Sequence, residues 1–191
     1  MAKLYFRYGT MGSAKTMNLL AVAHNYQQQD KNVLLIKPKL DSRFGVELIR
    51  SRAGIEKSAD ILVEADSVLD VNQFEGLHCI LVDEAQFLST SLIEQLRHVT
   101  IDMNIPVICY GLRTDFTGHL FEGSKRLLEL CDTIEEVKTT CNFCNRKAIF
   151  NMKLINGQAT LQGPTVDLGA EEKYLPACTK CYYEKLKVSE I

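Results

Sequence analysis

The chain has 191 residues, of which 46% are hydrophobic and 24% are charged, and 22 Lys and Arg against 24 Asp and Glu give a net charge of −2. This composition excludes disordered and collagen-like chains, and the balanced charge argues against a nucleic-acid partner, which usually needs clustered Lys and Arg. No apolar run approaches the roughly 18 residues of a membrane span and the N-terminus has no signal-peptide pattern, so we expect a cytoplasmic protein without a membrane partner.

Short apolar runs alternate with longer helical patterns over residues 4–138, which is typical of βαβ units around a parallel sheet. The runs are almost continuously apolar, as in Cys79-Ile80-Leu81-Val82, and this favours a sheet covered by helices on both faces. The sequence therefore predicts an α/β fold for residues 1–138. The expected strands are residues 4–8, 33–37, 78–83, 106–111 and 134–138.

A phosphate-binding loop is predicted where the first strand ends. The run Gly9-Thr10-Met11-Gly12-Ser13-Ala14-Lys15-Thr16 follows a strand and opens a helix, which is the context that such a loop requires. Its backbone N–H groups suit phosphate oxygens, Lys15 adds positive charge, and the Thr16 hydroxyl can bind Mg²⁺. Ala14 stands where glycine usually precedes the lysine, and because alanine disfavours positive φ we expect a negative φ there. The alternative is a small-residue turn without a ligand.

Two helices are predicted between the strands. In the first, Met17, Leu20, Ala21 and His24 recur at helical spacing, so we expect them in the core. The second begins after a Ser89-Thr90-Ser91 cluster that suits an N-cap. Its apolar stripe consists of Leu92, Ile93, Leu96, Val99 and Met103.

Two adjacent carboxylates, Asp83 and Glu84, end an apolar strand at the sheet edge where open α/β folds bind ligands. Because neighbouring strand residues point to opposite sides, Asp83 can face a Mg²⁺ ion and Glu84 can face a phosphoryl acceptor. Glu84 is therefore the candidate base. The run Asp83-Glu84-Ala85-Gln86 also resembles the second motif of helicase-type ATPases, in which the Glu orients water, so an ATPase switch stays open as an alternative.

Four of the seven cysteines form two CxxC pairs, Cys141-Asn142-Phe143-Cys144 and Cys178-Thr179-Lys180-Cys181, and four thiolates suit a structural zinc ion. Between the pairs, Asn156-Gly157 predicts a tight hairpin turn. We therefore expect residues 139–191 to form a small zinc-binding domain. A redox role for one CxxC pair and a nucleic-acid-binding zinc ribbon are the alternatives.

Taken in order, these motifs resemble the cytosolic, zinc-containing type of thymidine kinase. The phosphate loop, Asp83-Glu84-Ala85-Gln86-Phe87, the run Tyr110-Gly111-Leu112-Arg113-Thr114-Asp115-Phe116 and the two CxxC pairs carry the resemblance, which covers nearly the whole chain. It implies a RecA-like P-loop sheet with a zinc-ribbon and lasso domain. It also implies transfer of the ATP γ-phosphoryl group to the 5′-hydroxyl of thymidine or deoxyuridine, giving dTMP, by a homotetramer that dTTP inhibits.

The resemblance also implies roles for individual residues. ATP would bind residues 9–16 and Asp83, Glu84, Ala85 and Gln86, with Mg²⁺ at Thr16 and Asp83 and with Glu84 as the catalytic residue. Zinc would bind Cys141, Cys144, Cys178 and Cys181. The nucleoside would contact Met11, Asp41, Arg43, Phe87, Leu112, Phe116, Phe121, Thr165, Asp167, Leu168, Gly169 and Tyr174. The lasso would correspond to residues 161–174, where Val166-Asp167-Leu168-Gly169-Ala170 replaces a more usual Gly-Gly pair.

Overall fold

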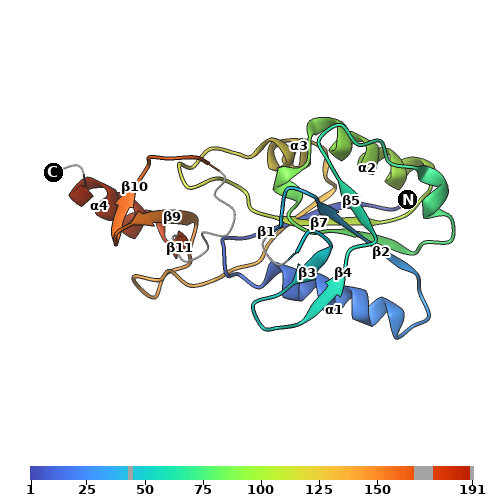
Figure 1. Cartoon of the computed structure of the whole chain (residues 1–191), viewed down its shortest axis with the longest axis horizontal. Coiled ribbons are helices and arrows are strands. Elements are labelled where there is room, and N and C mark those ends of the chain that lie inside the picture. The colour runs from blue at the N-terminus through green and yellow to red at the C-terminus, as the bar shows by residue number, and fades with distance from the viewer. Residues whose placement is uncertain (43–44, 166–173, 190–191) are drawn as a thin grey trace.

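A six-stranded parallel sheet forms the centre of the structure, a computed structural model that describes residues 1–42, 45–165 and 174–189 (Figure 1). The strand order is β5-β2-β6-β7-β1-β8, and neighbouring strands pair in parallel throughout. The five predicted strands are confirmed, whereas β5 is a three-residue edge strand that the sequence pattern does not predict. The strands are β1 (Leu4–Tyr8), β2 (Val33–Pro38), β5 (Ile61–Val63), β6 (Cys79–Val82), β7 (Val107–Gly111) and β8 (Thr133–Glu136).

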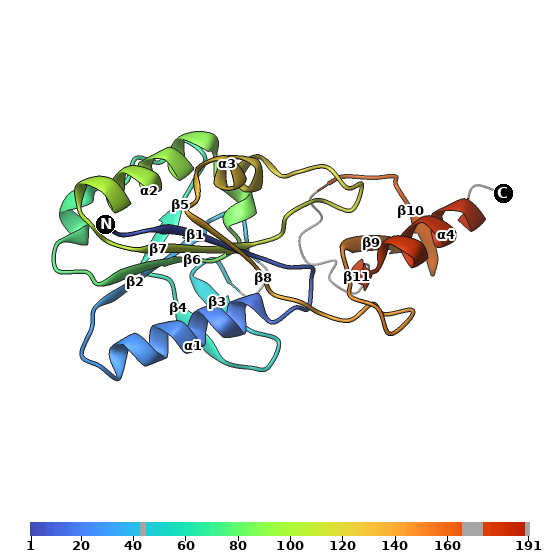
Figure 2. The same cartoon turned by 180° about the vertical axis from the view of Figure 1, so that it is seen from behind.

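Helices cover both faces of this sheet (Figures 1 and 2), which confirms the expected α/β fold. One face is covered by α1 (Lys15–Gln27), and the other by α2 (Thr90–Asp102) and α3 (Glu122–Leu130). Because β6 is buried along its whole length, its alternate side chains enter the two separate cores on either side. All six strands run the same way, so the loops that follow β1, β2 and β6 emerge at one edge of the sheet.

The second predicted helix is confirmed as α2. Ser89 has an extended backbone, and its Oγ accepts a hydrogen bond from the Leu92 N–H at 3.4 Å, so the predicted N-cap is present. The predicted stripe faces the sheet. Its members Leu92, Ile93, Leu96 and Val99 are buried, and Met103 is partly buried against the same core.

The first predicted helix is present as α1, but the expected buried face is wrong in part. Met17, Ala21 and His24 are exposed. Leu20 enters the core as predicted, and Leu19 and Ala23 enter it with Leu20. Apolar residues occur on most of the helix surface, so spacing alone does not choose its buried face. Packing against the side chains of β2, β6 and β7 makes that choice.

After β8 the chain leaves the parallel sheet and forms a smaller antiparallel unit at the opposite end of the molecule from the N-terminus (Figure 2). In this unit β9 (Phe150–Ile155) lies between β10 (Gln158–Thr160) and β11 (Tyr174–Ala177), and α4 (Thr179–Ser189) packs against β9 and β10. The predicted hairpin is confirmed, because Asn156 and Gly157 join β9 to β10 with φ values of 52° and 79°.

A second hairpin, which the sequence pattern does not predict, consists of β3 (Leu48–Arg50) and β4 (Glu56–Ser58). It lies outside the main sheet and contacts α1. Two short 3-10 helices, η1 (Val71–Phe74) and η2 (Ala85–Phe87), flank β6 in the chain. Within the described ranges, no helix is both long enough and apolar enough to cross a membrane.

Candidate functional site

The loop between β1 and α1 forms a cradle whose shape depends on small residues. The Ser13 N–H donates to the Thr10 carbonyl at 3.2 Å, and a Cβ on Gly9 would clash with Ser13 Oγ and with the Val137 carbonyl. Position 9 therefore requires glycine, because the loop passes close to the chain that follows β8. The Thr10 hydroxyl is buried and has no hydrogen-bond partner in the described part of the chain, which suits a loop that receives a hydrogen-bonding ligand.

Lys15 begins α1 and folds back over this loop. Its ammonium group donates to the Thr10 carbonyl at 2.8 Å and lies 3.4 Å from Ser13 Oγ. Only 9% of Lys15 is exposed, so the positive charge is concentrated at the N-terminus of α1. Backbone N–H groups at a helix N-terminus also attract anions. The combined arrangement of residues 9–16 suits phosphate oxygens.

The backbone of Ala14 contradicts the sequence-based expectation of a negative φ. Ala14 has φ 63° and ψ 28°, in the left-handed region. It is the N-cap of α1, and its carbonyl accepts a hydrogen bond from the Asn18 N–H at 2.9 Å. The tight path from loop to helix sets this conformation, which costs alanine about 1–2 kcal/mol. The alanine methyl group itself has room, because Ala14 is exposed.

We expect Ala14→Gly to raise the free energy of unfolding by about 0.5–1 kcal/mol. Glycine removes the strain at positive φ, although the greater freedom of the unfolded chain offsets part of the gain. The matched control is Ala21→Gly on the exposed side of α1, which is expected to lower the free energy of unfolding by about 1 kcal/mol. Urea denaturation measures both changes. A loss of stability in Ala14→Gly would contradict the strain that we infer.

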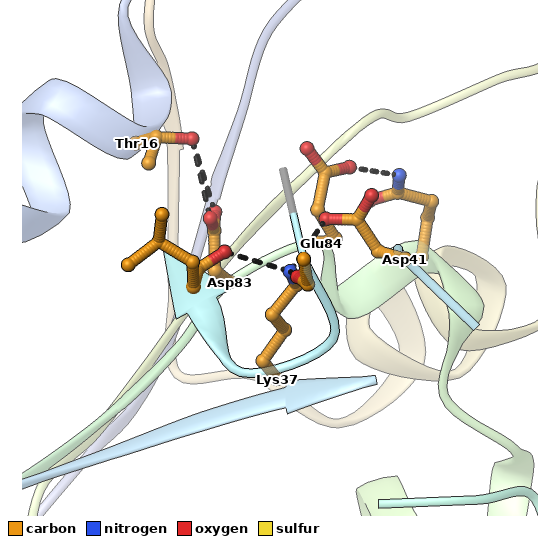
Figure 3. Close-up of polar contacts among 8 residues, drawn as sticks. Thr16, Lys37, Asp41, Asp83 and Glu84 are labelled. Carbon is orange, nitrogen blue, oxygen red and sulfur yellow. Dashed lines mark hydrogen bonds and ion pairs between the residues drawn. The ribbon is translucent and has the colours of Figure 1, made fainter. Parts of the chain in front are cut away.

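A hydroxyl and a carboxylate face each other beside the loop (Figure 3). Thr16 in the first turn of α1 has its Oγ1 at 3.3 Å and 3.2 Å from the two carboxylate oxygens of Asp83, which directly follows β6. Asp83 is 4% exposed. Hydroxyl and carboxylate oxygens are the donors that Mg²⁺ prefers, so this pair has the chemistry to hold that ion next to the phosphate-binding loop.

Glu84 lies beside Asp83, but strand alternation does not set its direction. β6 ends at Val82, and Glu84 has φ 49° and ψ 40°, so it turns out of the strand in the left-handed region. Both carboxylates line the same cleft, which corrects the expectation that they face opposite sides. The Gln86 Nε2 donates to Glu84 Oε2 at 2.5 Å, and Gln86 Oε1 accepts from the Leu112 N–H at 3.0 Å. Gln86 therefore fixes Glu84 relative to the end of β7.

The cleft has a volume of about 230 Å³ and collects residues from distant parts of the chain. The phosphate-binding loop forms one wall, Asp83 and Glu84 form another, and Leu112 and the 3% exposed Asp41 also line it. Asp41 follows β2 and forms an ion pair with Lys37 (Figure 3). The structure thus brings together predicted residues that lie up to about one hundred positions apart in the sequence.

The predicted aromatic contacts fall into two groups. Phe87 and Phe121 stack edge to face with ring centroids 5.7 Å apart. Phe116 and Tyr174 lie 6.1 Å apart, and Met11 packs against them. Only the second group includes a residue of the phosphate-binding loop.

Among the other predicted nucleoside contacts, Thr165 is exposed at the end of a described range. Phe87 lines a separate cavity of about 370 Å³ rather than the main cleft. The remaining predicted contacts, Arg43, Asp167, Leu168 and Gly169, lie outside the described residues.

The four cysteines of the two CxxC pairs converge at one point. Their Sγ atoms all lie within 4.8 Å of one another, and the Sγ atoms of Cys144 and Cys178 are 3.6 Å apart. The Phe143 N–H donates to Cys141 Sγ at 3.4 Å, and the Cys181 N–H donates to Cys178 Sγ at 3.5 Å. Four thiols at this spacing match the donor set of a tetrahedral zinc site.

The local environment favours thiolates at two of these cysteines. Burial opposes ionisation of Cys141, but hydrogen bonds from the backbone of Cys178 and Phe143 outweigh it and lower the pKa to about 7. The backbone N–H of Cys181 lowers the pKa of Cys178. Burial and the neighbouring thiols raise the pKa of Cys181 to about 12. Because thiolates are the form that binds metal, the cluster could hold zinc.

Comparison with known proteins relates nearly the whole chain to one family. A family model described as thymidine kinase matches residues 2–182. The chain belongs to the thymidine kinase family. The thymidine kinase of Lactococcus lactis subsp. lactis (strain IL1403) is 44% identical over 186 residues, covering 96% of this chain and 98% of that protein. The thymidine kinase of Streptococcus pyogenes serotype M3 (strain ATCC BAA-595 / MGAS315) is 40% identical over 188 residues, with 96% and 98% covered.

The thymidine kinase resemblance that the motif order predicts is therefore confirmed. Among solved structures, the Pif1 helicase from Candida albicans has a TM-score of 0.39 and 10% identity, covering 71% of this chain and 36% of that chain. A likeness at that level supports no inference about this member of the thymidine kinase family.

Several residues in or next to the cleft of this thymidine kinase family member give no signal in the sequence. Arg50, at the end of β3, and Arg52, in the turn after it, line the cleft. The guanidinium group of Arg52 lies close to Gly12, since its Nη1 would be 3.6 Å from a Cβ atom at that position. Asn151 of β9 accepts a hydrogen bond from the Met11 N–H at 2.7 Å. Lys37 is buried behind Asp41. None of these four belongs to a local motif, so only the folded chain reveals them.

Proposed function

We propose that this protein is an ATP-dependent thymidine kinase, which transfers the γ-phosphoryl group of ATP to the 5′-hydroxyl of thymidine or deoxyuridine and gives dTMP. The observation that carries the proposal is the convergence of a phosphate-binding loop, the Thr16–Asp83 pair and the Glu84 carboxylate on one cleft. Such a set suits phosphoryl transfer to a hydroxyl group. The choice of thymidine as the nucleoside rests on membership of the thymidine kinase family.

In the proposed mechanism, backbone N–H groups of residues 9–16 and the Lys15 ammonium bind the phosphates of ATP. Asp83 and Glu84 would border the same nucleotide, whereas Ala85 and Gln86, also assigned to it from the sequence, are buried in η2. Thr16 and Asp83 would hold Mg²⁺, which neutralises charge on the phosphate oxygens when bound. Arg52 adds a guanidinium group beside the loop, and its planar donors suit phosphate oxygens.

Glu84 is proposed as the base. Its carboxylate takes the proton of the 5′-hydroxyl while the 5′-oxygen bonds to the γ-phosphorus, and the bond between that phosphorus and the bridging oxygen breaks to release ADP. The hydrogen bond from Gln86 holds the carboxylate toward the cleft. The left-handed backbone of Glu84, which costs about 1–2 kcal/mol, fits a residue whose position serves the reaction.

The nucleoside is proposed to lie between the cleft and the C-terminal unit. Met11, Phe116 and Tyr174 would contact the thymine base, and Asp41, with Arg43, would serve the 5′-hydroxyl end. Leu112 lines the cleft and would complete the pocket there, and the stacked Phe87 and Phe121 would contribute from outside the main cleft. The lasso would bind the base through Thr165, Asp167, Leu168 and Gly169.

We further propose that residues 1–138 form the nucleotide-binding domain and that residues 139–191 form a zinc-binding domain. Zinc at Cys141, Cys144, Cys178 and Cys181 would anchor the lasso, because the second CxxC pair directly follows β11. Anchoring a loop at its ends reduces the entropy that is lost when it closes over a substrate. The family resemblance also supports a cytoplasmic homotetramer that dTTP inhibits.

The first test of this proposal is ADP release from Mg-ATP by purified protein, with thymidine, with deoxycytidine and without a nucleoside. We expect strong ADP release only in the reaction that contains thymidine, and we expect dTMP to form in equal amount. The reason is that the acceptor hydroxyl replaces water in the closed site. Release at the same rate in all three reactions would overturn the proposal. In that case Glu84 would orient water, as in an ATPase.

A further inference from the structure

Lys37 is a buried cation that the proposed mechanism does not use. It lies near the end of β2 and is 1% exposed. A buried ammonium group is costly unless charged or polar partners surround it. The contacts of Lys37 should therefore show what the lysine does.

The Lys37 ammonium group has three polar partners, two backbone carbonyls and one carboxylate. Its Nζ donates to the Leu48 carbonyl at 2.8 Å and to the Gly45 carbonyl at 3.2 Å, and it lies 3.4 Å from Asp41 Oδ2 (Figure 3). An ammonium group has three donors and no acceptor. Lys37 itself is not among the residues that line the cleft. It is therefore placed to hold protein groups rather than to touch a substrate.

The partners of Lys37 are parts of the site wall. Asp41 lines the cleft together with Asp83 and Glu84, so three carboxylates meet around one space. The Asp41 side chain is only 4% exposed, and a nearby cation offsets both its desolvation and its repulsion by the other carboxylates. Without that cation, the Asp41 carboxylate would favour a position closer to solvent.

The two carbonyl partners extend the effect to the neighbouring backbone. Gly45 lies three residues before β3, and Leu48 is the first residue of that strand. The same strand carries Arg50, which lines the cleft. One ammonium group thus joins the chain after β2 to the start of β3. Arg43 lies between these two anchored points in the sequence. An apolar residue at position 37 could fill the space but could not make these three contacts.

We propose that Lys37 is a positioning residue, which fixes the Asp41 carboxylate and the start of β3 from behind the cleft. The inference rests on the proposed function, because Asp41 is proposed there to serve the 5′-hydroxyl end of the nucleoside. Lys37 acts through Asp41, so its loss should impair use of thymidine and leave binding of ATP to the phosphate loop intact.

The test is a double-mutant cycle of Lys37→Met, Asp41→Asn and the combined variant, with kcat and KM measured for thymidine and the Kd of ATP measured by titration calorimetry. We expect Lys37→Met to lower kcat/KM for thymidine about tenfold or more, with the Kd of ATP within about twofold of wild type. The combined variant should lose less than the product of the two single losses, because the lysine acts in part through that carboxylate. Lys39→Met is the matched control, since Lys39 is exposed and pairs with Glu64; its kinetics should match wild type.

Two results would overturn the assignment. One is wild-type thymidine kinetics in Lys37→Met, and the other is a combined variant whose losses multiply, which would mean that the two residues act independently. If Lys37→Met leaves too little folded protein, the comparison of the combined variant with Asp41→Asn decides the question, because the combined variant removes both charges and leaves no carboxylate buried without its cation. Absence of thymidine-dependent ADP release in the wild-type protein would instead reject the proposed function.

Discussion

Replacing Glu84 with glutamine is expected to lower kcat for thymidine phosphorylation by about 10²-fold or more while ATP still binds. Glutamine has nearly the same size, and its amide oxygen can still accept the hydrogen bond that Gln86 Nε2 donates to Glu84. The amide cannot take the proton of the 5′-hydroxyl. The variant therefore removes proton transfer and leaves the shape of the cleft in place.

The measurement is kcat for thymidine-dependent ADP release, together with the Kd of ATP. Glu75→Gln is a matched control, because Glu75 is an exposed carboxylate outside the cleft, and it should behave as wild type. Turnover of Glu84→Gln near the wild-type rate would refute the role as base. Thymidine-independent ADP release that Glu84→Gln abolishes would point to water as the acceptor.

Replacing Cys178 with serine is expected to remove zinc and to raise the KM for thymidine by about tenfold or more, a loss of ~1.4 kcal/mol. Cys178 directly follows β11, and Tyr174 at the other end of that strand contacts Phe116. Losing one of four thiolates opens the metal site and frees the strand that leads out of the lasso. The nucleoside must then order this segment when it binds.

The α/β domain should remain folded in Cys178→Ser, because its two cores on either side of the sheet contain no residue of the cysteine cluster. Zinc content, circular dichroism and the KM for thymidine are the measurements. Cys131→Ser is the matched control, since Cys131 is a partly buried cysteine outside the cluster, and it should keep its zinc. An unchanged KM in a variant that has lost zinc would contradict the anchoring role.

Local patterns in the sequence predict most of the fold. The apolar runs predict β1, β2, β6, β7 and β8, because a strand buried on both faces must be apolar along its length. Ser89 and the stripe after it predict α2, and Asn156-Gly157 predicts the turn between β9 and β10. The three-residue strands β3, β4 and β5 leave no such pattern because too few side chains are involved.

The chemistry of the candidate site is also visible in short motifs, since the residues of a phosphate-binding loop or a CxxC knuckle are neighbours in the chain. The sequence by itself thus determined the loop at residues 9–16, the Asp83–Glu84 pair and the two cysteine pairs. The order of these motifs indicated the thymidine kinase family, which the family model confirms.

Only the tertiary structure decided how these motifs meet. The left-handed backbone of Ala14 follows from the path between β1 and α1, which overrides the preference of alanine. The buried face of α1 follows from its packing against the sheet. The contacts of Lys37 with the Gly45 and Leu48 carbonyls, the approach of Arg52 to Gly12 and the hydrogen bond from the Met11 N–H to Asn151 join residues that share no local pattern. Such contacts depend on packing between distant segments, and side-chain type at one position does not specify its partner at another.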